Sequence, residues 1–158
     1  MIDSARFRSV IGAFPTGVMA LAAEVDGVPV GMAANSFTSV SLDPPLVLVC
    51  VAHSSSTWPV LAQAPVLGIS VLAAAQARIG RQLSARGVDR FDGVEWTARP
   101  SGAILLDGAC AWLECEPHTV HRAGDHDIVV LRVVDLDADP DGQPLIFHLS
   151  RFLDPAER

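Results

Sequence analysis

The order of apolar and polar residues predicts a chain of short strands with a few short helices. Near the N-terminus, four apolar residues share one face of a helical repeat: Phe7, Val10, Ile11 and Phe14. Asp3 or Ser4 can cap this helix, which we expect to run through Ala13 and to end at Pro15-Thr16-Gly17. We expect a short helix over 57–64 and a longer one over 73–85, because the second segment is rich in Ala, Gln and Arg.

Apolar runs predict the strands, which are 18–25, 28–32, 46–51, 66–72, 109–121, 127–136 and 144–149. Asp26-Gly27 is a strong signal for a two-residue hairpin between the first two strands. The run 46–51 is expected to be buried on both faces, and 86–108 to be a loop. Six or more strands with two or three short helices predict a mainly β protein, a β-barrel with helical additions.

The stretch from Gly31 to Thr57 carries the main functional signal. It begins with small residues on which a flat ligand can lie, and continues with short hydroxyl and amide side chains. It ends, after the run 46–51, in the turn Ser54-Ser55-Ser56-Thr57, whose free N–H groups can bind an anion. Together they indicate a phosphorylated planar cofactor. Two simpler interpretations stay open: an exposed strand face over 36–41 and a plain helix cap at the serine turn.

The amino-acid composition limits the class of protein and the partners it can have. We expect the 158 residues to form one domain, and 50% of them are apolar, which favours a packed barrel together with a buried subunit interface. No apolar run reaches the ~18 residues of a membrane-spanning helix. A net charge of −7 argues against nucleic acid or anionic membrane as a partner. Three cysteines without CxxC spacing and an N-terminus without a signal-peptide core predict a cytoplasmic protein.

Other kinds of chemistry find less support in the sequence. His118 and His121 lie three apart on a predicted strand and face opposite sides, so we expect no metal site. Cys50, Cys110 and Cys115 fit core packing. Neither a Ser-His-Asp order nor a pair of carboxylates stands out, and no GxGxxG follows a predicted strand.

Five motifs in order resemble the flavin reductase-like family. They are FPTGV at 14–18, NSFTSVSLDPPLVLVCV at 35–51, DRFDGVEW at 89–96, GACAWLEC at 108–115 and GDHDI at 124–128. The resemblance implies a homodimer of six-stranded FMN-binding split β-barrels of the Greek-key type. It implies bound FMN or FAD, with NADH or NADPH as a transiently bound hydride donor. It also implies that the protein supplies reduced flavin to a separate flavin-dependent monooxygenase.

The resemblance further assigns roles to individual positions. The isoalloxazine ring and ribityl chain would lie along Ala33, Asn35, Ser36 and Phe37, with Thr16 and Gly17 beside the flavin. The ribityl chain and phosphate would be approached by Val51, Ala52, Ser54, Ser56 and Thr57. Positive charge would come from Arg90, or alternatively from Arg81 or Arg86. His126 would be the catalytic residue beside the nicotinamide, where its proton is available near neutral pH.

Two positions depart from the family pattern. Leu131 stands where Gly is frequent, and Phe152 stands where Tyr is common. Phe152 can still stack on the flavin but cannot donate a hydrogen bond, so these changes bear on substrate preference and rate. Two alternatives to a reductase remain: a barrel that stores or senses flavin without turnover, and a carrier of an apolar ligand.

Overall fold

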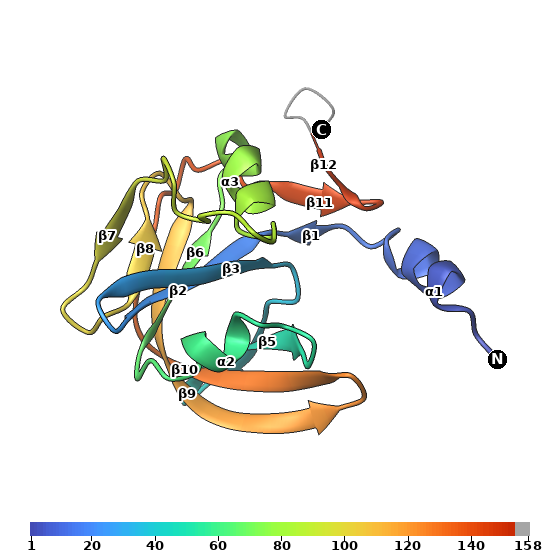
Figure 1. Ribbon diagram of the computed structural model, residues 1–158, viewed down its shortest axis with the longest axis horizontal. Helices are drawn as coiled ribbons and strands as arrows, with labels where there is room; N and C mark the ends of the chain where they lie inside the picture. The colour runs from blue at the N-terminus through green and yellow to red at the C-terminus, as the bar shows by residue number, and fades with distance from the viewer. Residues whose placement is uncertain (154–158) are drawn as a thin grey trace.

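The computed structural model describes residues 1–153 and shows a mainly β chain with short helices (Figure 1). The helices are α1 (Ser4–Ile11), α2 (Trp58–Leu61), the 3₁₀ helix η1 (Ala74–Gln76) and α3 (Ala77–Gln82). Asp3 caps α1, because its side chain accepts a hydrogen bond from the Arg6 N–H at 3.1 Å. Within the described residues, no helix is long and apolar enough to cross a membrane.

One antiparallel sheet of seven strands forms the body of the structure. Its strands are β2 (Met19–Val25), β3 (Val28–Ala34), β4 (Thr38–Leu42), β5 (Pro45–Ala52), β6 (Leu67–Val71), β9 (Ala111–Ala123) and β10 (His126–Ala138). They pair in the order β3-β2-β6-β9-β10-β5-β4. The hairpins β2–β3, β9–β10 and β4–β5 thus share one sheet, and β6 joins the first to the second.

Two small sheets complete the fold. One has the order β1-β11-β12, from β1 (Thr16–Gly17), β11 (Ile146–His148) and β12 (Arg151–Phe152). The other pairs β7 (Trp96–Ala98) with β8 (Ile104–Leu106). Ile104 and Leu106 of β8 pack with Leu83, which directly follows α3, in one apolar cluster. The same cluster contains Ala20 and Ala22 of β2, so β8 and the residue after α3 cover the large sheet on one side.

Strand β2 is the central element of the packing, because it is buried on both faces. Met19, Leu21 and Ala23 point into the larger core, which also contains side chains of β5, β6, β9 and β10. Ala20 and Ala22 point the other way, into a second core with residues of β8 and the segments next to α3. The alternation follows from the two-residue period of a strand, and small alanines let the second layer approach closely.

The predicted fold class is confirmed at the level of a mainly β protein with short helices. The Asp26-Gly27 hairpin is also confirmed: both residues have positive φ, 52° and 75°, as a type I′ turn requires. The two long strands predicted over 109–121 and 127–136 are β9 and β10. The large sheet has seven strands rather than six, and within the described chain its edge strands β3 and β4 are not paired with each other.

Three sequence expectations were wrong in detail. The segment 86–108 is not a loop throughout, because it contains β7 and β8, which are too short to give a clear pattern. The run 46–51 is fully buried on one face only, at Val47, Val49 and Val51, and half-buried on the other. The helix predicted over 57–64 is the single turn α2, which begins with Trp58-Pro59.

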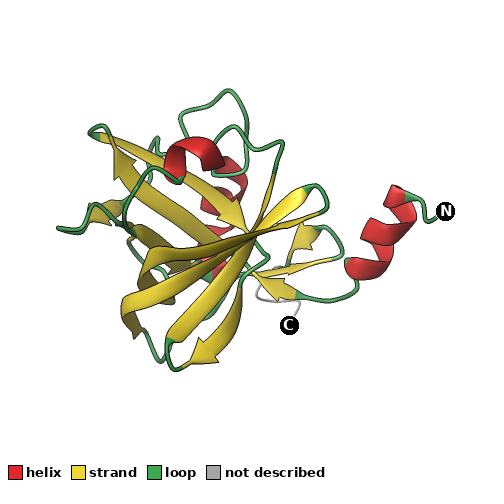
Figure 2. Cartoon of the chain, turned by 90° about the horizontal axis from the view of Figure 1, so that it is seen from below, coloured by secondary structure: helices red, strands yellow, loops and turns green. Residues whose placement is uncertain are grey.

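Helix α1 stands away from the rest of the chain, at the end of the extended β1 segment (Figure 2). None of its residues is buried. The predicted apolar face exists but is uncovered: Phe7 is 56% exposed, Val10 65%, Ile11 56% and Phe14 74%. Two hydrogen bonds hold the following segment to the body, from Leu149 N–H to Gly12 O at 2.9 Å and between His148 Nε2 and Ala13 O at 3.1 Å.

Candidate active site

The serine-rich turn predicted to hold an anion lies between β5 and α2. Ser55 N–H donates to Ala52 O at 3.0 Å, and Ser55 Oγ accepts from Trp58 N–H at 3.1 Å, so Ser55 closes the turn. Within the described residues, no hydrogen bond uses the backbone N–H of Ser56 or Thr57. Since α2 is one turn long, its dipole is small, and an anion here would depend on N–H groups, hydroxyls and nearby cations.

Arg90 binds three segments of its own chain. Its Nε donates to Ala85 O at 2.9 Å, and its Nη1 donates to Gly31 O at 3.1 Å and to Thr57 Oγ1 at 2.9 Å. Burial, with a smaller contribution from the positive charge of Arg86, lowers the pKa of Arg90. Arg90 remains a cation, but most of its donors are engaged in tying β3 and the serine turn to the 85–90 segment.

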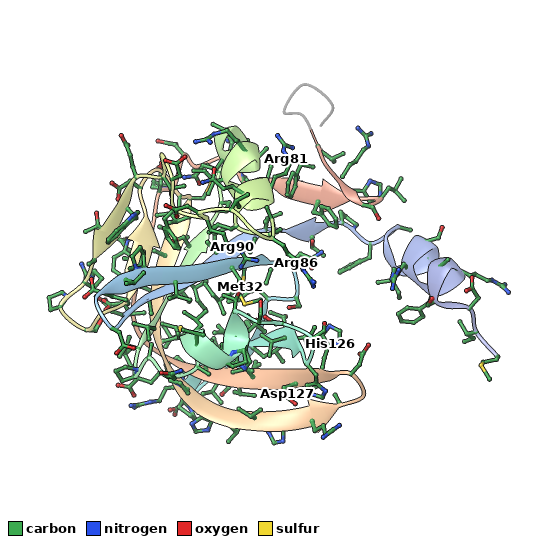
Figure 3. The ribbon with its side chains drawn as sticks, in the orientation of Figure 1. Met32, Arg81, Arg86, Arg90, His126 and Asp127 are labelled. Atoms are coloured by element: carbon green, nitrogen blue, oxygen red, sulfur yellow. The ribbon has the colours of Figure 1, made fainter. Side chains whose placement is uncertain are left out.

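Arg86 is the cation that remains exposed beside the turn. A cleft of about 220 Å³ is lined by residues of the serine turn, of β3 and of the segment after α3: Met32, Ala33, Ala52, Ser54, Ser55, Ser56, Thr57, Leu83, Ser84, Arg86 and Arg90. Figure 3 shows Arg86 and Arg90 beside the end of β3, with Met32 nearby. Arg86 and Arg90 thus line the cleft at the serine turn, and Arg81 is not among the residues that line this cleft.

A second cleft, also of about 220 Å³, continues from the first, because Ala33 and Ser84 line both. Its other lining residues are mostly apolar: Val18, Ala34, Asn35, Phe147 and Phe152. Phe147 and Phe152 meet edge to face, with ring centroids 5.6 Å apart. The guanidinium of Arg81 lies 5.5 Å from the Phe152 centroid. The two clefts form one groove, polar and cationic at the turn and apolar and aromatic at the other end.

The remaining predicted flavin contacts are dispersed around this groove. Thr16 lines a neighbouring cleft of about 290 Å³ together with Asn35 and Phe147. Its Oγ1 is buried and has no hydrogen-bond partner among the described residues. Gly17 and Phe37 line a smaller cleft of about 70 Å³, which also contains Asn35. Asn35 is therefore the residue at which three clefts meet.

The side chains of two residues that were expected to contact the flavin have structural roles. Ser36 Oγ donates to Cys50 O at 3.0 Å and accepts from Cys50 N–H at 2.9 Å, so it fixes the segment before β4 to β5. Val51 is 2% exposed and belongs to the larger core. Leu131, one of the departures from the family pattern, is also fully buried there.

His126 begins β10 and lies directly opposite Ala52 in the β5–β10 pairing. Ala52 lines the cleft at the serine turn, so His126 is next to this end of the groove. His126 Nδ1 is 2.7 Å from Asp125 Oδ1, and the His126 side chain is 45% exposed. Figure 3 shows His126 and Asp127 together at the start of β10.

Five of the lining residues were not expected at the site from the sequence: Val18, Met32, Leu83, Ser84 and Phe147. They come from the residue before β2, from β3, from the segment after α3 and from β11, which are far apart in the chain. Their residue types are ordinary for core or surface positions, and only the tertiary arrangement brings them together. Phe147 is a partial exception, because it is an aromatic residue close in sequence to Phe152, which was expected to contact the flavin.

The fold is a mainly β protein with an elongated groove that is polar and cationic at the serine turn and apolar and aromatic at the other end. Residues 11–155 match the family described as flavin reductase like domain. The chain belongs to this family, which confirms the resemblance seen in the motifs.

Named relatives support the same assignment. The chain is 38% identical over 151 residues to "Flavin-dependent monooxygenase, reductase subunit HsaB" of Rhodococcus jostii, covering 96% of this chain and 77% of the relative. It is 42% identical over 156 residues to "NADH-dependent FAD reductase" of Streptomyces globisporus, covering 95% and 85%. These names confirm the predicted enzyme class, a flavin reductase.

A solved structure agrees with the whole fold. The NADH:FAD oxidoreductase SgcE6 of Streptomyces globisporus C-1027, in complex with NAD and FAD fragments, matches with a TM-score of 0.90 and 40% sequence identity. The match covers 99% of this chain and 96% of that chain. Since it includes nearly every described residue, the small sheets and α3 are part of the shared architecture.

Proposed function

We propose that residues 1–158 form one NAD(P)H:flavin oxidoreductase domain that reduces FMN or FAD and supplies the reduced flavin to a partner monooxygenase. The observation that carries the proposal is the continuous groove from the serine turn and Arg86 to Asn35, Phe147 and Phe152. Its cationic end suits a phosphate, and its apolar end suits a flat ring.

The residues present fit a flavin. Free N–H groups at Ser56 and Thr57, with Arg86, would hold the phosphate, and Ala33 leaves room for the ribityl chain. The unpaired Thr16 Oγ1 beside Asn35 offers a buried hydroxyl to the polar edge of a ring. When bound, flavin supplies the electron-accepting chemistry, and the protein contributes binding and orientation.

The chain's own side chains would orient the hydride donor. We place the nicotinamide ring against the flavin ring, on the side of the groove that is reached from His126, which lies opposite Ala52 at the start of β10. Because the ring of His126 is partly exposed, a donor can enter and leave from solvent, as a transiently bound substrate must. His126 would contact the nicotinamide and help to hold it against the flavin.

Two finer parts of the proposal concern architecture and assembly. The curved seven-stranded sheet is interpreted as a split β-barrel of six principal strands with one added edge strand, in Greek-key connectivity. The exposed apolar face of α1 is interpreted as part of a homodimer interface, because it lies apart from its own chain and needs a covering partner. A cytoplasmic location agrees with the free thiols of Cys50 and Cys115.

The direct test is steady-state oxidation of NADH and NADPH by the purified protein with added FMN or FAD. The proposal predicts flavin-dependent oxidation of at least one nicotinamide nucleotide. Flavin binding without oxidation would instead indicate a storage or sensor protein, and absence of any flavin binding would refute the proposed site. Sedimentation velocity tests the assembly: a dimer is expected, and a monomer that persists at high protein concentration would contradict it.

A further inference from the structure

A separate polar cavity lies on the other side of the segment that borders the groove. It has a volume of about 430 Å³ and is lined by residues of α3 and of the segment 85–92. We call it the α3 niche. Two arginines and two aspartates line it, Arg78, Arg81, Asp89 and Asp92, and none of the four lines either cleft of the groove.

The side chain of Gln82 fixes the shape of the α3 niche. Its Nε2 donates to the carbonyl oxygens of Asp89, Arg90 and Asp92, at 3.2, 3.2 and 2.8 Å. Its Oε1 accepts from Arg78 Nη1 at 3.0 Å. One side chain therefore ties α3 to the turn at 89–92, and the niche is formed before any ligand binds.

The charged side chains of the niche are not paired with one another. Among the described residues, no ion pair joins Arg78 or Arg81 to Asp89 or Asp92. The Asp89 carboxylate accepts one hydrogen bond, from the Phe91 N–H at 3.0 Å, and the Asp92 carboxylate accepts none from the described part of the chain. The niche thus presents donors and acceptors in one cavity, which suits a ligand that carries both.

One short loop separates the niche from the phosphate end of the groove. Arg86 lines the groove at the serine turn, while Ala85 and Val88, on either side of it in sequence, line the niche. Gly87 lies between Arg86 and Val88, and a Cβ at Gly87 would meet nothing within 4 Å. The Cα atoms of Arg86 and Val88 are at most about 7 Å apart. A ligand with a phosphate at Arg86 can therefore extend over Gly87 into the niche.

We propose that the α3 niche binds the adenosine monophosphate group of a dinucleotide whose flavin or nicotinamide half lies in the groove. This inference rests on the proposed function. The ribose hydroxyls and the adenine amino group are donors, which suit the carboxylates of Asp89 and Asp92. The phosphate oxygens and the ring nitrogens of adenine are acceptors, which suit the guanidinium groups of Arg78 and Arg81. Val88 is 53% exposed and offers an apolar surface to the base.

A comparison of FAD with FMN isolates the niche, because the two flavins differ only by this adenosine monophosphate group. Asp92→Ala removes an acceptor and Arg78→Ala removes a donor, and both side chains belong to exposed residues, so we expect both variants to fold. Each variant should lower the affinity for FAD about threefold to tenfold in a fluorescence titration and leave the affinity for FMN unchanged. If the group belongs to the hydride donor, the KM for NADH should rise by a similar factor with FMN as the flavin.

Two control variants remove the same charges outside the niche. Glu95→Ala removes an exposed carboxylate three residues after Asp92, and Arg6→Ala removes an exposed guanidinium on α1. Both should have the FAD affinity and the KM of the wild type. In the niche variants, a lower FAD affinity assigns the niche to the flavin, and a higher KM for NADH assigns it to the hydride donor. If neither quantity changes, or if FAD and FMN lose affinity equally, the proposal is wrong.

Calorimetry with 5′-AMP tests the niche without turnover. FMN is added first, so that its phosphate occupies the serine turn, and protein that binds no FMN is titrated directly. We expect 5′-AMP to bind the wild type and to bind more weakly to Asp92→Ala and Arg78→Ala. No binding of 5′-AMP to the wild type, or equal affinity in all variants, would overturn the inference. A wild type that oxidises neither NADH nor NADPH refutes the proposed function, while this titration still decides whether the niche binds the group.

Discussion

Arg90 links three segments around the groove, so its removal should reduce both stability and flavin affinity. Replacing it with Ala breaks the bonds to Ala85 O, Gly31 O and Thr57 Oγ1, at 2.9, 3.1 and 2.9 Å. The bond to Ala85 O closes the 85–90 segment on itself, the bond to Gly31 O holds this segment against β3, and the bond to Thr57 Oγ1 holds the end of the serine turn. The phosphate site would then lose its support as well as a cation.

The size of the effect follows from these contacts. A hydrogen bond contributes about 1 kcal/mol net, and bonds to charged groups contribute somewhat more when buried. Arg90 is half-buried, so three bonds give about 3 kcal/mol of unfolding free energy, slightly offset by relief of repulsion from Arg86. For a domain of this length, 3 kcal/mol corresponds to a decrease in melting temperature of about 6 to 12 °C.

Thermal unfolding followed by circular dichroism and FMN titration followed by flavin fluorescence measure the two effects. Arg90→Lys should be intermediate, because one ammonium group cannot span three separated acceptors. Exposed Arg6 provides a control for loss of charge, and Arg6→Ala should change stability by no more than about 0.5 kcal/mol. A wild-type melting temperature in Arg90→Ala would refute the role assigned to these three bonds.

Three further predictions test separate features. Arg86→Ala should lower the affinity for FMN about fivefold to tenfold and leave the affinity for riboflavin unchanged, because Arg86 lies at the proposed phosphate end of the groove. An equal loss of affinity for both ligands in a fluorescence titration would contradict this. Gly68→Ala should lower the free energy of unfolding by more than about 3 kcal/mol, because a Cβ would lie 2.0 Å from Ile104 O. Gly17 is the control: a Cβ there meets open space, so Gly17→Ala should have the melting temperature of the wild type. Burial, and next the negative charge of Glu114, raises the pKa of Cys115 to about 12, so iodoacetamide should modify this thiol only after unfolding. Alkylated Cys115 in mass spectra of the native protein would disprove this.

Local signals in the sequence were sufficient for much of the fold. The Asp26-Gly27 hairpin depends on two adjacent residues that accept positive φ, and the Asp3 cap depends on a side chain three residues from its partner. Strands β9 and β10 are long enough for their apolar residues to be recognised. In contrast, β7 and β8 have three residues each and pair only with each other in a small sheet, so no periodic pattern marks them.

In the candidate site, too, features that depend on adjacent residues could be predicted, and features that depend on residues far apart in the chain could not. The serine turn is contiguous in the sequence and lies in a cleft, and the anion site expected there stays a prediction. The hydrogen bonds of Arg90 could not be predicted from the sequence, because its partners Gly31 and Thr57 are 59 and 33 residues away in the chain. The contact of Ser36 with the cofactor stays a prediction, and the two hydrogen bonds of its hydroxyl to Cys50 could not be predicted because they depend on the folded arrangement of the chain.

The central claim is that this groove binds flavin so that a nicotinamide nucleotide can reduce it. The most direct test is an anaerobic stopped-flow experiment in which protein with bound FMN or FAD is mixed with NADH or NADPH while the visible absorption of oxidised flavin is followed. We predict that this absorption is lost much faster than for the same flavin free in solution, and that Arg86→Ala weakens FMN binding without abolishing reduction of the bound flavin. Bound flavin that stays oxidised with both nucleotides would contradict the account.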